Sequence, residues 1–164
     1  MSARRYYDDL VVGEKRESHE ETVELDALLA FSRAYDPQYF HTDPQAARNS
    51  VFGEVIASGI YTMALWRKLD HEISGDIAWI CGIAWEEVKW PVAVRAGDKV
   101  RAQFECLAKR PSSSDPTRGV VEFRYAAEPA RGNRVDLPQH QSRRDGATDR
   151  GRLIARPITR PARS

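Results

Sequence analysis

Apolar residues in the first half of the chain recur at helical spacing. Residues 25–35, LDALLAFSRAY, predict a helix. Its predicted inward positions are Leu25, Leu28, Leu29, Phe31 and Ser32. Pro37 disfavours helical geometry in the residue before it, so this helix should end at or before Asp36. The pair Asp43-Pro44, a capping residue followed by proline at the first helical position, predicts a second and shorter helix.

The longest predicted helix covers residues 58–74, SGIYTMALWRKLDHEIS. Its predicted inward positions are Ile60, Met63, Ala64 and Leu65. Loose alternation in residues 15–25, KRESHEETVEL, predicts a strand before the helices.

The pattern changes to strands after residue 76. Residues 77–90, 98–110 and 118–127 are rich in β-branched and aromatic residues. Turn-forming residues separate them at 91–98, PVAVRAGD, and at 110–119, RPSSSDPTRG. Successive strands joined by short loops predict an antiparallel sheet, and one long apolar helix needs a sheet face to cover it. We therefore predict an α+β fold in which a curved antiparallel sheet wraps around a long central helix, as in the hotdog fold.

Composition limits the classes of function. The 164 residues carry a formal net charge of +1, which argues against a surface that binds nucleic acid. No apolar run is long enough to cross a membrane, and the N-terminal residues lack the apolar segment of a signal peptide. Cys81 and Cys106 show neither a disulfide pattern nor the spacing of a zinc site. We expect a cytoplasmic protein without a metal.

The C-terminal residues differ from the rest. Residues 129–164 hold nine Arg, three Asp and no aromatic residue, whereas residues 1–128 contain every Phe, Tyr and Trp. We predict one folded domain over 1–128 and an Arg- and Pro-rich tail over 129–164, which is either naturally disordered or the product of a frameshift. Its one strand candidate is GRLIARPIT, and Pro157 should confine that strand to a sheet edge. We therefore expect the sheet to lack its last strand.

The chemistry-bearing residues gather in one stretch, residues 35–66. Asp36 and His41 lie five residues apart, just before the longest predicted helix. That helix begins at Ser58-Gly59. An acid, an imidazole and the free amides of a helix start are groups that catalyse proton transfer and stabilise an oxyanion.

The same stretch resembles the MaoC-like acyl dehydratases, which include the R-specific enoyl-CoA hydratases. The family motif has an Asp, a His five residues later, a second Asp, then Phe-Gly and a glycine that begins the central helix. Here these residues are Asp36, His41, Asp43, Phe52, Gly53 and Gly59, and the resemblance extends over residues 6–125. The chain departs from many members in having Gln38-Tyr39 for Asn-Pro and Ser58 for His.

The resemblance implies an enzyme that adds water to a 2-enoyl thioester of CoA or of acyl carrier protein, or removes it, without a cofactor. One group must take a proton from water while another delivers one to the α-carbon. His41 suits the base because an imidazole titrates near neutral pH, and Asp36 suits the acid if burial keeps it partly protonated. The N–H of Gly59 would bind the developing oxyanion. Which side chain holds which proton is left open.

The remaining residues of the predicted site have supporting roles. Tyr39 and Phe40 are expected to line an acyl pocket, and Ser58 to lie against the substrate. Asp43 is assigned to capping. Such hotdog sheets commonly pair edge to edge, so we expect a homodimer.

Plainer interpretations stand beside this one. Alone, Asp36 is a turn cap before Pro37, His41 a hydrogen-bonded loop histidine, and Ser58 an ordinary N-cap. Two other functions use the same residues: a thioesterase that activates water toward the carbonyl, and a non-catalytic acyl-binding subunit of a heterodimer. The order and spacing of the residues together favour the hydratase.

Overall fold

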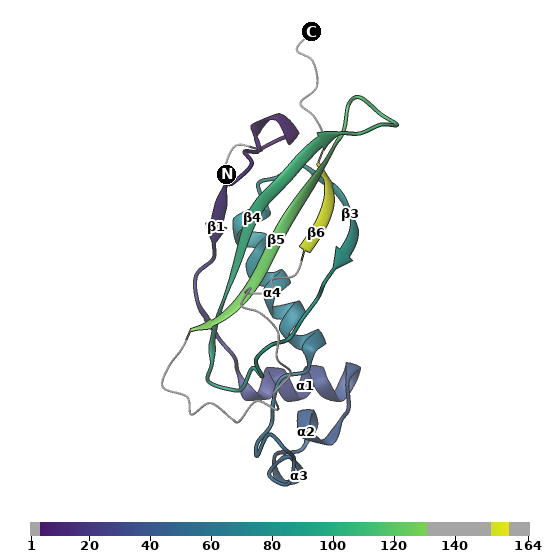
Figure 1. Ribbon diagram of the computed structural model, residues 1–164. Coiled ribbons are helices and arrows are strands. Elements are labelled where there is room, and N and C mark those ends of the chain that lie inside the picture. Colours follow the sequence, from purple (N-terminus) through teal and green to yellow (C-terminus); the bar gives the residue numbers. More distant parts are fainter. Residues whose placement is uncertain (1–3, 131–151, 158–164) are drawn as a thin grey trace, which may run out of the picture.

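The computed structural model describes residues 4–130 and 152–157 (Figure 1). In chain order its elements are a short 3-10 helix Tyr7–Asp9, β1 Lys15–Glu17, β2 Glu21–Thr22, α1 Leu25–Tyr35, α2 Tyr39–Thr42, α3 Pro44–Ala47, α4 Gly59–Ser74, β3 Trp79–Glu86, β4 Lys99–Pro111, β5 Gly119–Ala130 and β6 Arg152–Pro157. The predicted helices at 25–35 and 58–74 and the three predicted strands after them are all present.

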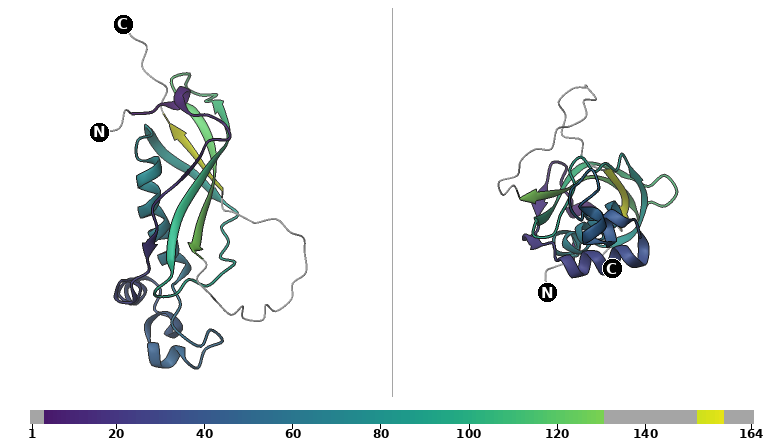
Figure 2. Two further views of the ribbon diagram at one scale, coloured as in Figure 1. Left: turned by 90° about the vertical axis from the view of Figure 1, so that its left-hand side faces the viewer. Right: turned by 90° about the horizontal axis from the view of Figure 1, so that it is seen from below.

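The strands form one antiparallel sheet in the order β1-β4-β5-β6-β3, and β2 pairs with β4 beside β1. The sheet curves around α4, and α1, α2 and α3 gather at one end of it (Figures 1 and 2). The prediction of an α+β hotdog fold is therefore confirmed.

Aromatic side chains join the helix to the sheet. Phe104 on β4 and Tyr125 on β5 are register partners, and both are buried on the face toward α4. The ring of Trp66 on α4 packs edge-on against Tyr125, with centroids 4.7 Å apart. Burying aromatic side chains contributes most of the stabilisation in such a layer. The core therefore fixes the position of α4, and with it the position of the residues at its start.

The predicted inward face of α4 was rotated from the observed one. Ile60 is 53% exposed and Ala64 is exposed, whereas Leu65 is buried as predicted. The face toward the sheet carries Thr62, Leu65, Trp66, Leu69, Asp70, Ile73 and Ser74. The prediction favoured aliphatic residues, but the buried face of α4 also holds Trp66 and the hydrogen-bonded pair Asp70 and Ser74.

The first predicted strand is divided into β1 and β2. Ser18 lies between them and forms two hydrogen bonds with Ala102 on β4. The N–H of Ala102 donates to Ser18 Oγ (2.9 Å), and the N–H of Ser18 donates to the Ala102 carbonyl (2.9 Å). The hydroxyl replaces a main-chain acceptor, so the chain bends there without leaving an unpaired group.

The expectation that the sheet lacks its last strand is wrong. β6 lies between β5 and β3, and its backbone pairs with both, from Val121↔Ala155 on β5 to Glu86↔Arg152 on β3. Pro157 does not confine it to an edge, because it is the final residue of the strand and faces only Trp79 on β3. The rest of the predicted tail, at 131–151 and 158–164, lies outside the described residues, so its disorder or frameshift stays a prediction.

Candidate functional site

His41 lies inside a single turn of helix that the sequence did not predict. Pro37 ends α1, and the chain turns and forms α2 from Tyr39 to Thr42. The His41 side chain is buried, and its Nδ1 lies 2.7 Å from the carbonyl oxygen of Ile56. A carbonyl oxygen only accepts hydrogen bonds, so Nδ1 carries a proton and donates it. In the neutral ring Nε2 therefore holds the lone pair.

Asp36 lies on the Nε2 side of this ring. It is the C-cap of α1, and its Oδ2 is 3.7 Å from His41 Nε2. The other carboxylate oxygen, Oδ1, accepts a hydrogen bond from Gln38 Nε2 at 3.0 Å. The two sides of the carboxylate are thus distinct: one is held by Gln38, and the other faces the imidazole.

The segment before α4 is bound to α2 through both main-chain groups of one residue. Ile56 N–H donates to the carbonyl of Phe40 (3.1 Å), and the Ile56 carbonyl accepts from His41. The preceding turn needs Gly53, which has a φ of +71°, a conformation that side-chain-bearing residues rarely adopt. The sequence Phe52-Gly53 therefore serves to bring residues 55–59 back against the imidazole.

Ser58 and Gly59 form the start of α4. Ser58 Oγ accepts a hydrogen bond from the N–H of Tyr61 (3.1 Å), and the Ser58 side chain is fully buried. As a cap the Ser58 hydroxyl only accepts, and its O–H is left to donate, so the expectation that Ser58 lies against the substrate stays a prediction. The first N–H groups of an α-helix have no partner within the helix, and the positive end of the helix dipole lies there.

Gly59 contacts an aromatic side chain from a distant loop. Trp90 Nε1 donates to the Gly59 carbonyl oxygen at 3.1 Å, and a Cβ built on Gly59 would lie 2.8 Å from Trp90 Cε2. Such an approach is closer than any ordinary Cβ contact, so the glycine permits the indole to lie against α4.

The two predicted pocket aromatics occupy different settings. Phe40 packs edge-on against the His41 ring, with centroids 4.5 Å apart, and against Phe52 at 5.5 Å. Tyr39 is half exposed and contacts Phe40. Phe40 therefore borders the imidazole directly, whereas Tyr39 borders Phe40. Asp43 caps α3 as predicted, accepting from the N–H groups of Gln45 and Ala46.

Sequence reasoning missed three features of this site. The Gln38 side chain was noted only as a departure from the family motif. The Ile56 carbonyl carries no sequence signal, because any residue can supply it. Trp90 carries no sequence signal for this site either, because nothing in sequence spacing joins it to a residue 31 positions earlier.

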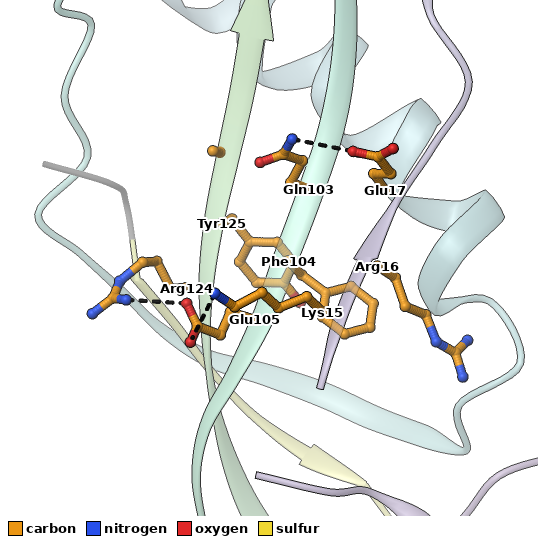
Figure 3. Close-up of a pocket in the computed structure, with 9 residues that line it drawn as sticks. Lys15, Arg16, Glu17, Gln103, Phe104, Glu105, Arg124 and Tyr125 are labelled. Atoms are coloured by element: carbon orange, nitrogen blue, oxygen red, sulfur yellow. Dashed lines mark hydrogen bonds and ion pairs between the residues drawn. The ribbon is translucent and has the colours of Figure 1, made fainter. Parts of the chain in front are cut away.

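A shallow cavity of about 240 Å³ lies elsewhere, over β1, β4 and β5 (Figure 3). Its charged groups are paired: Glu105 with Lys15 and Arg124, and Arg16 with Glu14 and Asp76 outside the cavity, while Gln103 donates to Glu17. None of its lining residues belongs to the segment from Asp36 to Gly59. We therefore do not place the chemistry in this cavity.

Within the described ranges, no group of three or more His, Cys, Asp or Glu side chains converges as a metal site would require. Among those same residues, none of the helices combines the length and apolar character needed to cross a membrane.

The chain is similar to several known proteins. Residues 9–125 match the model of the MaoC like domain. The chain is 34% identical over 101 residues to 3-hydroxyacyl-thioester dehydratase Z of Mycobacterium tuberculosis, covering 58% of this chain and 67% of that protein. It is 29% identical over 110 residues to the uncharacterized protein YdeM of Bacillus subtilis, a match that covers 66% of this chain and 77% of that protein. The crystal structure of the MaoC-like dehydratase from Rhodospirillum rubrum superposes on this chain with a TM-score of 0.76 at 30% sequence identity. The superposition covers 96% of this chain and 99% of that one.

Proposed function

This chain belongs to the MaoC-like domain family, and on that premise we propose that it is a hydratase or dehydratase of acyl thioesters. It adds water across the 2,3 double bond of a 2-enoyl thioester to give the 3-hydroxyacyl thioester, or catalyses the reverse. The observation that carries the proposal is the orientation of His41: Nδ1 is bonded to the Ile56 carbonyl, and Nε2 faces Asp36 Oδ2 at 3.7 Å.

This orientation suits one shared water molecule. A water that bonds both His41 Nε2 and Asp36 Oδ2 finds an acceptor in the imidazole and lies beside a carboxyl group. In the proposed step His41 Nε2 takes a proton from the water, and the oxygen forms a bond to C3. The electron pair of the double bond moves toward the thioester, and C2 takes a proton from Asp36, which enters this step as the neutral acid with its proton on Oδ2. Proton transfer from His41 Nε2 to Asp36 Oδ2 through the next water molecule, which bridges the 3.7 Å between them, restores the starting state.

Gly59 supplies the oxyanion donor in this proposal. The thioester oxygen gains negative charge as the C3–O bond forms, and a main-chain N–H at a helix N-terminus stabilises such charge. Ser58 holds this helix start rigid by capping Tyr61. Phe40, and Tyr39 beside it, are proposed to border the acyl group because they flank the imidazole.

The substrate class rests on the relatives. The Mycobacterium tuberculosis relative is named a 3-hydroxyacyl-thioester dehydratase, and we carry that chemistry to this chain as a proposal. A thioester of CoA and one of acyl carrier protein present the same reacting atoms, so both belong to the proposed class. The proposed reaction uses no cofactor, and the proposed location is the cytoplasm.

We propose a second copy of this chain as the partner. β3 ends the described sheet, and it exposes Ile80, Ile83 and Trp85, at 40, 46 and 44%. An apolar edge strand is a template for pairing with another strand. Edge-to-edge pairing of β3 with its counterpart would cover these residues.

The test is conversion of crotonyl-CoA by the purified chain. A hydratase removes the absorbance of the conjugated enoyl thioester without releasing free thiol, whereas a thioesterase releases thiol in proportion. Loss of the enoyl absorbance with thiol retained is the expected result. Stoichiometric thiol release would assign the thioesterase instead, and no turnover of any 2-enoyl-CoA chain length by the chain alone would contradict the proposal.

A further inference from the structure

The indole of Trp90 covers the first residue of α4. Its Nε1 donates to the Gly59 carbonyl oxygen, and its ring atoms Cε2 and Cζ2 lie 2.8 and 3.1 Å from where a Gly59 Cβ would stand. The ring is therefore in contact with the Gly59 backbone, whose N–H is the proposed oxyanion donor. A carbonyl oxygen bound to that N–H would therefore lie at the residue of α4 that the indole covers.

The loop that carries Trp90 is fixed to the segment that also holds the imidazole. Ala57 N–H donates to the Val94 carbonyl at 2.7 Å, and Ile56, its neighbour, accepts from His41. The guanidinium of Arg95, itself nearly buried, forms an ion pair with Glu54 at 2.6 Å. The Trp90 loop and His41 are thus both held by the few residues that precede α4.

Trp90 nevertheless keeps half of its surface free. It is 51% exposed, although its N–H is satisfied. Trp79 provides a comparison at the other end of the same helix, because its Nε1 donates to the Ser74 carbonyl at 3.0 Å. Trp79 is partly buried and packs against the ring of Phe123, with centroids 5.4 Å apart. An indole bonded to a helix carbonyl does not have to be exposed, so the free face of Trp90 needs another explanation.

We propose that Trp90 is a substrate-binding and specificity-determining residue, whose exposed indole face packs against the acyl thioester held at the first turn of α4. The inference rests on the proposed function and adds a wall to that site. An enoyl thioester is flat and conjugated, so it can stack on an indole, and its burial there removes apolar surface from water. The indole would also keep water away from the charge that develops on the thioester oxygen.

The experiment compares Trp90→Phe and Trp90→Ala with the matched variant Trp79→Phe. Intrinsic fluorescence is titrated with butyryl-CoA, a saturated thioester that cannot be hydrated, and steady-state kinetics are measured with crotonyl-CoA. We expect the ligand-dependent fluorescence change to disappear in Trp90→Phe and to persist in Trp79→Phe. We expect Trp90→Ala to raise KM by about tenfold or more, with a smaller effect on kcat, while the midpoint of urea unfolding stays near that of the wild type.

Persistence of the fluorescence change in Trp90→Phe, or an unchanged KM in Trp90→Ala, would overturn the inference while wild-type turnover still supported the proposed function. A wild-type chain that neither converts crotonyl-CoA nor binds butyryl-CoA would overturn both. If Trp90→Ala does not fold, the decision falls to Trp90→Phe, which keeps a ring in the same place.

Discussion

His41 Nε2 and Asp36 Oδ2 lie 3.7 Å apart, and each side chain is held on its far side by a different partner. The Ile56 carbonyl fixes the imidazole, and Gln38 fixes the carboxylate. The pair is therefore oriented before any ligand arrives, so the orientation costs nothing during catalysis.

Removing either member should abolish most activity. We expect Asp36→Asn and His41→Asn each to lower kcat by about 10²–10⁴-fold, because each removes one proton-transfer group. Asp43→Asn is the matched control: among the described residues, Asp43 accepts only the cap bonds of α3, which an Asn side chain also accepts, so kcat should stay near wild type. Circular dichroism checks that the three variants keep the fold. Near-normal turnover in a folded Asp36→Asn or His41→Asn variant would remove the assignment.

Gly59→Ala tests the contact between the helix start and Trp90. The added Cβ would lie 2.8 Å from the indole, so the ring must move away. We expect kcat/KM for crotonyl-CoA to fall about tenfold, or about 1.4 kcal/mol of transition-state stabilisation. If the ring displacement is the cause, Gly59→Ala should cost much less in a Trp90→Ala background, as a double-mutant cycle measures. Equal costs in both backgrounds would show that the methyl group acts on the substrate itself.

Ser58→Ala separates capping from chemistry. Ser58 Oγ is buried and accepts from Tyr61 N–H, so its loss should lower the free energy of unfolding by about 1 kcal/mol. Kinetic constants should remain close to wild type. Urea denaturation and crotonyl-CoA kinetics on one preparation give both numbers. A stable Ser58→Ala protein without activity would instead assign the hydroxyl a chemical role.

Much of the fold could be predicted from local signals. Pro37 correctly predicted that α1 ends at or before Asp36, which is its C-cap, and Asp43-Pro44 correctly predicted the cap of α3. The positions of β3, β4 and β5 along the chain were correct because β-branched and aromatic residues are concentrated there. What these signals share is that each acts within a few residues along the chain.

Apart from α2, a single local turn that no pattern predicted, the main errors concern contacts between distant segments. Helical spacing shows which side chains share a face, but the choice between Ile60 and Trp66 as the buried side depends on the sheet. β6 has an Arg-rich sequence, and its place between β5 and β3 comes from strand pairing rather than from local propensity. In the site, the Asp-His pair was visible as a spacing, whereas the Gln38, Ile56 and Trp90 contacts appear only in three dimensions.

Asp70 should make stability depend on pH. Its side chain is fully buried beneath the sheet; Oδ2 is bonded by Ser74 and paired with Arg67, while Oδ1 has no hydrogen-bond partner among the described residues. Burial raises the pKa of Asp70, an effect that the Ser74 hydrogen bond and Arg67 only partly oppose. Between the ordinary Asp pKa of about 3.9 and this raised value, the folded state binds more protons than the unfolded state. The free energy of unfolding therefore falls as pH rises through that window.

Asp70→Asn removes this dependence, since the amide does not ionise. The free energy of unfolding of the variant minus that of wild type, measured by urea unfolding, should therefore be larger at pH 7 than at pH 4. Asp115→Asn is the control of opposite sign. Hydrogen bonds from the side chain and main chain of Thr117 lower the pKa of Asp115, so the stability that this carboxylate contributes is present at pH 7 and is lost only below the ordinary Asp pKa of about 3.9. The stability deficit of Asp115→Asn relative to wild type should therefore be smaller at about pH 3 than at pH 7. If the free energy of unfolding of Asp70→Asn differs from that of wild type by the same amount at pH 4 and pH 7, the pH dependence does not come from Asp70.

Ile83→Glu tests whether β3 is the interface between two copies. Ile83 lies on the edge strand and is 46% exposed, and in an edge-to-edge dimer it would be covered by the partner strand. A buried, unpaired carboxylate is costly, so the variant should shift from dimer to monomer in size-exclusion chromatography with light scattering. Val12→Glu is the matched control, because Val12 is 53% exposed in a turn outside the strands and its substitution should leave the mass unchanged. A wild-type protein that is monomeric at micromolar concentration, or an Ile83→Glu variant that stays dimeric, would show that β3 is not the interface.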